Sequence, residues 1–191
     1  MFYTFKTYIK VMKLFVVSSI AASGKTTLVD YVTEKFDLYK LKTCTTRPVR
    51  EEEKGDEYYF VSKTRFNVMA HLNYFIENST VYDNYYGLLA SEVDDNKDKN
   101  RIVILDVQGT EKILKLYPEA VTIFIMPPPY GEVRERLLAR NTDANDVEAR
   151  LKEMTMEVLE SENYEYHIKY GNLDDMKAEI SKIIEREIIL D

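Results

Sequence analysis

The sequence predicts an α/β fold in which a parallel sheet is covered by helices on both faces. Four short apolar runs have the length and composition of strands buried on both sides: Leu14–Val17, Ile102–Leu105, Val121–Met126 and Tyr166–Tyr170. Segments with helical periodicity follow these runs, and strands that alternate with helices in this way pair in parallel. A ligand of such a sheet is expected at the carboxyl ends of the strands.

Each predicted helix presents an apolar face at intervals of three or four residues. In chain order these faces are made by Leu28, Val32 and Phe36; by Ile113 and Leu114; by Val133, Leu137 and Leu138; and by Leu173, Met176, Ile180, Ile183 and Ile184. These are the stripes that would cover the sheet.

Two stretches break the alternation. Residues 43–90 are rich in Tyr, Asn and charge and contain short alternating runs, which predicts a small, partly β insertion that binds the acceptor. Residues 137–162 carry arginines and then a long amphipathic helix with Val147, Leu151, Met154 and Val158 on one stripe, which predicts a lid. The predicted organisation is an extension at 1–12 and one domain at 13–191, with its core at 13–42, 91–136 and 163–191, an acceptor-binding lobe at 43–90 and a lid at 137–162.

Composition excludes several classes of function. A chain of 191 residues, 45% hydrophobic, can bury one good core, and its net charge of −7 repels nucleic acid and anionic membranes. The single cysteine, Cys44, rules out an internal disulfide and predicts a cytoplasmic protein. No apolar run reaches the length of about 20 residues that a membrane span requires.

The stretch SSIAASGKTT, residues 18–27, has the features of a phosphate-binding loop between a strand and a helix. In such a loop, backbone N–H groups surround the phosphates, a Lys reaches the outer phosphates, and a Ser or Thr hydroxyl binds Mg²⁺. The corresponding residues are Gly24, Lys25 and Thr26, and the alternative is a plain strand-to-helix turn. The usual first glycine is Ser19, which would be strained only in a left-handed backbone conformation. The predicted nucleotide-binding residues are Ala21, Ala22, Ser23, Gly24, Lys25, Thr26 and Thr27.

The beginning of the chain also imitates a secretory signal, because Lys6, Lys10 and Lys13 precede the apolar run LFVVSSIAAS. Cleavage near Ala21–Ser23 would destroy the loop. We therefore assign the run to a buried strand.

Asp106 follows the strand sequence IVIL, which places a carboxylate at the carboxyl edge of the sheet. It can hold Mg²⁺ or its water there. The alternative is that Asp106 caps the helix that begins in QGTEK.

The segment TCTTRPVR sets Arg47 and Arg50 three residues apart, with Tyr58 and the sequence NYYG at 84–87 following. Guanidinium forks and phenol hydroxyls suit the capture of a phosphate monoester. The alternative is a solvated loop.

Seven motifs together resemble those of guanylate kinases, in that family's order, over nearly all of the chain from Lys13 to Ile184. They are TTRPVR at 45–50, EYYFVS at 57–62, FIEN at 75–78, NYYG at 84–87, LDVQG at 105–109, IFIMPPP at 123–129 and RERLLAR at 134–140.

This resemblance implies a P-loop NTPase-type kinase that converts ATP and GMP into ADP and GDP with Mg²⁺. We expect a monomer or homodimer that binds neither nucleic acid nor membrane. Arg47, Arg50, Tyr58 and Tyr86 would hold the acceptor phosphate, Glu77 and Thr43 would bind the guanine, and Arg136, Arg140 and Arg150 would close over the transferred phosphoryl group. A carboxylate accepts from the two donors of guanine and has no hydrogen to offer adenine.

The chain departs from the family at several positions. Leu88 replaces a Ser or Thr that helps to hold the base, and Ile104 replaces the first of two alternating acidic residues. The sequence YGNLDD at 170–175 replaces an Asn-Asp pair that lines the adenine site. The spacing around 51–55 is one residue short, which leaves Glu52 and Glu53 as alternatives for one acidic position.

Two other functions are compatible with these departures. The first is a P-loop kinase for another phosphorylated compound, such as ribose 1,5-bisphosphate. The second is an inactive binding module, although Lys25, Thr26 and the lid arginines are retained here, whereas such modules tend to lose them.

Overall fold

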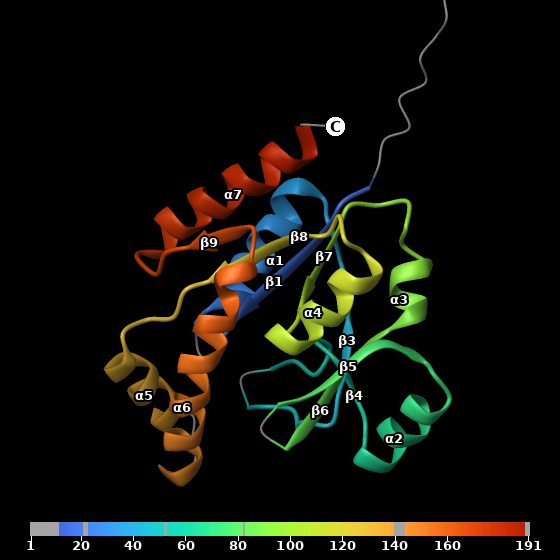
Figure 1. The fold of residues 1–191 in the computed structure, drawn as a ribbon, viewed down its shortest axis with the longest axis horizontal. Helices are drawn as coiled ribbons and strands as arrows, with labels where there is room; N and C mark the ends of the chain where they lie inside the picture. Colours follow the sequence, from blue (N-terminus) through green and yellow to red (C-terminus); the bar gives the residue numbers. More distant parts are fainter. Residues whose placement is uncertain (1–11, 21–22, 52, 82, 140–143, 190–191) are drawn as a thin grey trace, which may run out of the picture.

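The computed structural model describes residues 12–20, 23–51, 53–81, 83–139 and 144–189, with the backbone alone for 144–146. The predicted fold class is confirmed, because a five-stranded parallel sheet lies at the centre of the molecule with helices on both faces (Figure 1). In spatial order its strands are β2 (Tyr39–Lys40), β7 (Arg101–Ile104), β1 (Leu14–Ser19), β8 (Val121–Ile125) and β9 (Tyr166–Ile168).

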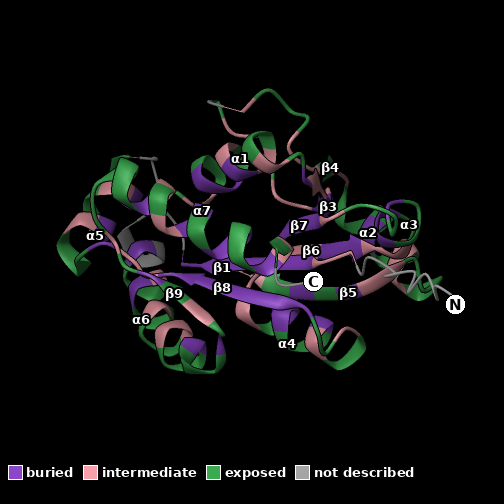
Figure 2. Ribbon diagram, turned by 90° about the horizontal axis from the view of Figure 1, so that it is seen from above, coloured by how far each residue is buried: buried purple, intermediate pink, exposed green. Residues whose placement is uncertain are grey.

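The side chains of β1 alternate between two cores, as the pleat of a strand requires. Phe15 and Val17 pack in the cluster that α1 (Lys25–Phe36) and α7 (Leu173–Ile189) cover. Leu14 and Val16 point to the opposite face, where Ile113 of α4 (Val107–Leu116) packs against them. Viewed from above, the buried strands run between α1 and α7 on one side and α4 on the other (Figure 2).

A second sheet of mixed direction is formed within residues 43–89. Its order is β4 (Tyr59–Phe60), β3 (Thr43–Thr45), β6 (Asn84–Leu89) and β5 (Phe75–Val81), and only the pair of β3 and β4 is parallel. Two helices accompany it, α2 (Lys63–His71) and α3 (Ala90–Asp94). Phe66 of α2 stacks on Phe75 with ring centroids 4.4 Å apart, which fixes this helix against the sheet.

The predicted lid contains the end of α5 (Tyr130–Ala139), α6 (Ala144–Glu160) and the 3₁₀ turn Ser161–Asn163. The stripe predicted for α6 is confirmed. Val147 and Leu151 are fully buried against Phe124 of β8, and Met154 and Val158 pack at the edge of the same cluster.

Several predicted boundaries were wrong. β7 ends at Ile104 and β9 at Ile168, both earlier than the apolar runs suggested, because Asp106 already caps α4 and the chain turns toward α7 after Tyr170. The two-residue strand β2 was not predicted individually, since two residues cannot show an alternation.

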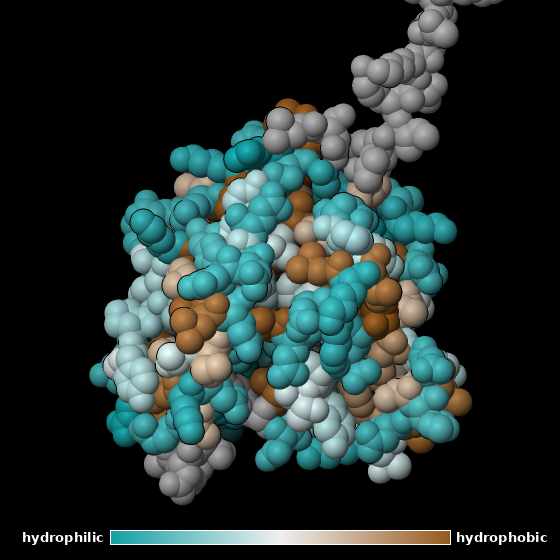
Figure 3. Space-filling view, viewed as in Figure 1, coloured by the Kyte–Doolittle hydropathy of each residue, from teal (hydrophilic) through white to brown (hydrophobic). Residues whose placement is uncertain are grey.

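The face shown in Figure 3 is mostly hydrophilic, and its apolar residues form separate small patches. Among the described helices, none combines the length and apolar content of a membrane-spanning helix.

Candidate functional site

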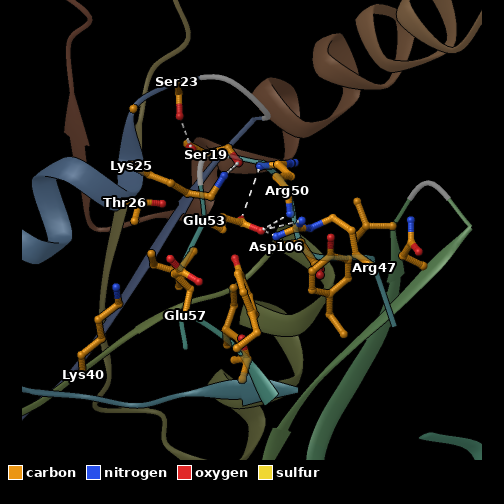
Figure 4. Close-up of a pocket in the computed structure, with 18 of the residues that line it drawn as sticks. Ser19, Ser23, Lys25, Thr26, Lys40, Arg47, Arg50, Glu53, Glu57 and Asp106 are labelled. Carbon is orange, nitrogen blue, oxygen red and sulfur yellow. Dashed lines mark hydrogen bonds and ion pairs between the residues drawn. The ribbon is translucent and has the colours of Figure 1, made fainter. Parts of the chain in front are cut away.

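A cavity of about 520 Å³ lies where the carboxyl ends of β1 and β7 meet the second sheet and α6 (Figure 4). Thirteen of the predicted site residues line it: Ser23, Gly24, Lys25, Thr26, Thr27, Thr43, Arg47, Arg50, Tyr58, Glu77, Tyr86, Asp106 and Arg150. Arg136 is not part of its lining. Ala21, Ala22 and Arg140 were also predicted but lie outside the described residues.

The phosphate-binding part of the cavity is built at the beginning of α1. Gly24 precedes this helix with φ +83°, a left-handed conformation that suits glycine, and as the N-cap residue it has no side chain to bond the first N–H groups of the helix. An uncapped helix N-terminus favours an anion. The Lys25 ammonium folds back and donates long hydrogen bonds to the carbonyls of Ser19 (3.5 Å) and Ile20 (3.4 Å).

Ser19 does not strain the loop. It is the last residue of β1 and has the backbone conformation of a strand, so its Cβ meets no left-handed penalty. Its hydroxyl lies 2.5 Å from that of Ser23 and so links the two ends of the loop (Figure 4). The serine in place of the usual glycine therefore adds a contact.

Arg47 is held in a nearly buried ion pair with Glu53. Its two terminal nitrogens donate to the two carboxylate oxygens at 2.6 Å and 3.0 Å, and the backbone N–H of Arg50 donates to the same carboxylate at 2.9 Å. Burial alone would raise the pKa of Glu53, but these hydrogen bonds outweigh it and lower the pKa. Of the two alternatives for the acidic position, Glu53 makes these contacts, while Glu52 lies outside the described residues.

Glu77 is the most unusual group in the cavity. It is 3% exposed, and its Oε2 atom has no hydrogen-bond partner. Burial, followed by repulsion from Asp106, raises the pKa of Glu77 to about 8, while Lys112 and a backbone hydrogen bond from Leu88 act in the opposite direction. Gly109 borders this carboxylate so closely that a Cβ there would lie 2.9 Å from Oε2. A buried acceptor without a donor indicates a ligand that supplies one.

Asp106 caps helix α4, which the sequence analysis gave as the alternative to binding Mg²⁺. Its Oδ1 atom accepts from the backbone N–H of Gly109 at 2.8 Å, and Ser79 donates its hydroxyl to Oδ2. Because Asp106 also lines the cavity, capping does not remove it from the site.

Sequence reasoning missed Glu157, which enters the cavity from α6 together with Arg150. The two residues are seven apart and so lie two turns apart on one face of the helix. Burial raises the pKa of Glu157 to about 7, opposed by the attraction of Lys25 and aided by the repulsion of Asp106. The spacing of Arg150 and Glu157 on a helix was the available signal.

The two departures at Leu88 and Ile104 have different environments. Leu88 is fully buried in the apolar cluster of α4, and its backbone pairs with Thr43 on one side and Glu77 on the other. Ile104 lines the cavity itself. Ile104 therefore presents an apolar side chain to the cavity at the position where guanylate kinases are expected to have a second carboxylate.

Arg136 occupies a separate cluster beside β9. Its Nη2 atom donates to Glu132 at 2.5 Å and to the hydroxyl of Tyr170 at 2.9 Å. Arg136 therefore lies outside the lining of the cavity, and its contact with the transferred phosphoryl group stays a prediction.

Comparisons with known proteins agree with this geometry. A family model described as guanylate kinase matches residues 11–187. A guanylate kinase of Hydrogenovibrio crunogenus is 36% identical over 175 residues, which cover 89% of this chain and 85% of the relative. One from Anaplasma phagocytophilum is 36% identical over 181 residues, covering 91% and 86%. A crystal structure of guanylate kinase from the same organism superimposes with a TM-score of 0.75 at 29% identity, covering 94% of this chain and 88% of that one.

Proposed function

The chain belongs to the guanylate kinase family, and we propose that it transfers the γ-phosphoryl group of ATP to GMP or dGMP, giving ADP and GDP or dGDP. The observation that carries this proposal is the unpaired carboxylate oxygen of Glu77, buried in the same cavity as Arg47 and Lys25. Guanine offers two adjacent N–H donors to such a carboxylate, and adenine cannot supply that pair. Thr43 lines the cavity and offers its hydroxyl to the same base.

The acceptor phosphate would bind to Arg47, Arg50, Tyr58 and Tyr86, which all line the cavity. Glu53 fixes the guanidinium of Arg47 before substrate arrives, and the Tyr58 ring lies 5.4 Å from that guanidinium. A planar fork held in place loses little entropy when it captures a phosphate.

ATP would place its phosphates on the uncapped N-terminus of α1, where Lys25 exchanges its long bonds to backbone carbonyls for the outer phosphates. The hydroxyl of Thr26 and the carboxylate of Asp106 line this region and are the oxygen donors that suit Mg²⁺. When bound, Mg²⁺ neutralises the charge that develops on the phosphates.

The transfer itself needs positioning and charge neutralisation. The second pKa of a phosphate monoester is about 6, so the attacking oxygen is already ionised near neutral pH and no strong base is required. Lys25 and Arg150 would stabilise the transferred group from the core side and the α6 side of the cavity. Closure of the lid, residues 137–162, over the lobe at 43–90 would exclude water, which otherwise would accept the phosphoryl group. Arg140 would join this closure.

We place the protein in the cytoplasm as a monomer or homodimer. The lone cysteine supports this compartment, because a chain with one cysteine cannot form an internal disulfide, and proteins of the reducing cytoplasm seldom contain one.

An acceptor screen tests the proposal. The protein is incubated with ATP and Mg²⁺ and with GMP, dGMP, AMP, UMP or ribose 1,5-bisphosphate. We expect kcat/KM for GMP or dGMP to exceed that for AMP by about 10⁴, because a buried carboxylate left unpaired rejects the wrong base. Glu77→Gln should reduce this ratio at least tenfold, whereas Glu51→Gln, an exposed carboxylate of the same lobe, should not change it. Transfer to ribose 1,5-bisphosphate without transfer to either guanine nucleotide would overturn the proposal.

A further inference from the structure

Three buried hydroxyl groups meet on the face of the parallel sheet that α4 and α6 cover (Figure 1 and Figure 2). Ser18, two residues after Val16 on β1, points to this face because successive side chains of a strand alternate. Its Oγ atom lies 2.9 Å from Oγ1 of Thr110 on α4 and 2.8 Å from the hydroxyl of Tyr164. Tyr164 is the first residue after the 3₁₀ turn that ends the lid. None of these three hydroxyl-bearing residues is more than 8% exposed.

The hydrogen bonds of this cluster run in one direction. Thr110 donates its hydroxyl hydrogen to the backbone carbonyl of Asp106 at 2.9 Å, so toward Ser18 it can only accept. Ser18 therefore donates to Thr110 and accepts from Tyr164. Burial raises the pKa of Tyr164 to about 12, so its hydroxyl keeps its hydrogen near neutral pH. A continuous chain of donors thus runs from the end of the lid to the backbone of Asp106.

The carbonyl that ends this chain belongs to a residue whose carboxylate lines the cavity. The same carbonyl of Asp106 accepts from the backbone N–H of Thr110 at 2.9 Å, and the carboxylate is held by Gly109 and Ser79. Hydrogen bonds that follow one another in a buried chain strengthen each other. The hydroxyl chain therefore ties the beginning of α4, with Asp106, to β1 and to the end of the lid.

The ring of Tyr164 is fixed independently of its hydroxyl. It packs edge-on against Phe124 of β8, with ring centroids 5.4 Å apart, in the apolar cluster that α6 covers. The backbone N–H of Tyr164 donates to the carbonyl of Ser161 at 2.9 Å. Tyr164→Phe would therefore keep this packing and remove only the donor on which the buried Ser18 depends.

We propose that Tyr164 is a positioning residue of the nucleotide site: through Ser18 and Thr110 it holds Asp106 in the place from which its carboxylate binds the Mg²⁺ of the donor nucleotide. Tyr164 is not part of the lining of the cavity, so it acts only through the groups that it holds. Partners that orient a metal ligand in this way contribute about 10- to 100-fold to metal affinity or activity. This inference rests on the proposed function.

Calorimetric titration of ADP, with Mg²⁺ or with EDTA in its place, tests the inference without turnover. With Mg²⁺, Tyr164→Phe should raise the Kd for ADP about tenfold, because the metal ligand is less well oriented. With EDTA, the Kd should stay within about twofold of the wild-type value, because no metal contact is present to be weakened. An equal rise under both conditions, or no rise with Mg²⁺, would overturn the inference.

Tyr166→Phe is the matched control. It removes a tyrosine hydroxyl that donates to Glu187 of α7 at 2.6 Å, and it should leave the ratio of the two Kd values unchanged. Thr110→Val breaks the chain at its other end and should act like Tyr164→Phe, whereas Thr110→Ser keeps the hydroxyl and should retain the wild-type ratio. A changed ratio in Tyr166→Phe, or an unchanged one in Thr110→Val, would reduce Tyr164 to a structural role.

A double-mutant cycle shows whether Tyr164 acts through Asp106. Asp106→Asn removes the charge that Mg²⁺ needs. Addition of Tyr164→Phe to that variant should then raise the Kd for ADP with Mg²⁺ by less than about twofold, because two changes that act through one contact are not additive. Additive effects of the two substitutions would contradict the inference.

Turnover separates this inference from the proposed function. Formation of GDP from ATP and GMP, with a kcat about tenfold lower in Tyr164→Phe and an unchanged KM for GMP, supports both. The expected changes in ADP binding without GDP from the wild type would leave the role of Tyr164 standing and refute the kinase function. GDP from the wild type with an undiminished kcat in Tyr164→Phe would do the reverse.

Discussion

Glu77 couples the cavity to pH because it is a buried carboxyl that also faces the like charge of Asp106. Burial raises its pKa from 4.5 to about 8, so the folded protein keeps a proton that the unfolded chain has lost between those values. The folded state then binds more protons than the unfolded state, and the free energy of unfolding falls as the pH rises from about 4.5 to 8. Guanine binding requires the opposite, ionised form.

The affinity for GMP should therefore increase with pH. As the pH rises from about 6.5 to 8.5, Glu77 ionises and gains the acceptor that guanine needs, so KM for GMP should fall several-fold. Starting above the phosphate pKa of about 6 keeps the acceptor phosphate ionised throughout. Steady-state kinetics with saturating ATP measures this change. Glu77→Gln should flatten the profile, and a steep profile retained in that variant would assign the titration to another group.

Ser19 replaces the usual first glycine of the phosphate-binding loop without straining the backbone there. The sequence predicted that Ser19 is tolerated if its backbone is extended, and the structure gives it the strand conformation. The bond to Ser23 could not be predicted, because it depends on how the loop folds back after β1. The same is true of the unpaired Oε2 of Glu77, which depends on the close approach of Gly109 from another element.

Removal of the Ser19 hydroxyl should be mildly destabilising. Ser19→Ala should lower the free energy of unfolding by about 1 kcal/mol, the usual value of one intramolecular hydrogen bond. Ser19→Gly should cost about 0.5–1 kcal/mol more, since glycine weakens a strand. Urea denaturation checks both values. A glycine variant more stable than the wild type would show that the loop prefers the usual residue after all.

The connection from β7 to α4 places Asp106 in two roles at once. It begins the helix by accepting from Gly109, is held by Ser79 of β5, and lines the cavity where Mg²⁺ would bind. A helix cap tolerates Asn as well as Asp, whereas a metal site needs the charge. The two roles therefore respond differently to substitution.

Asp106→Asn should keep the stability of the protein within about 0.5 kcal/mol and reduce kcat about 100-fold. Asp106→Ala should lose the same activity and about 1 kcal/mol of stability in addition, because the cap is removed. Thermal denaturation and steady-state kinetics on the two variants separate these effects. Full activity in Asp106→Asn would restrict this residue to its structural role.

Elements with a clear period could be predicted from the sequence, and short or irregular ones could not. The four apolar runs became β1, β7, β8 and β9, and the stripe on α6 packs as expected. The two-residue strands β2 and β4 carry no period, and their pairing is set by β7 and β3. Glu157 was missed because the helix pattern was used only to find the apolar face, and its spacing of seven residues from Arg150 was not considered.

The two sheets together determine what the molecule can do. The parallel sheet supplies the loop at α1, the second sheet supplies the acceptor residues, and α6 brings Arg150 and Glu157 to the same cavity. Motif order was enough to predict that these residues belong to one site. It did not predict that Arg136 lies with Tyr170 and Glu132, because that position depends on how α5 packs beside β9.

Formation of GDP from ATP and GMP by the wild-type protein and by Lys25→Ala tests the account most directly. The reaction is followed by separating the nucleotides, and thermal denaturation shows that the variant is folded. The account predicts that the wild type converts GMP to GDP and that Lys25→Ala loses about 10³-fold in kcat with an unchanged melting temperature. No GDP from the wild type, or undiminished turnover in a folded Lys25→Ala variant, would contradict it.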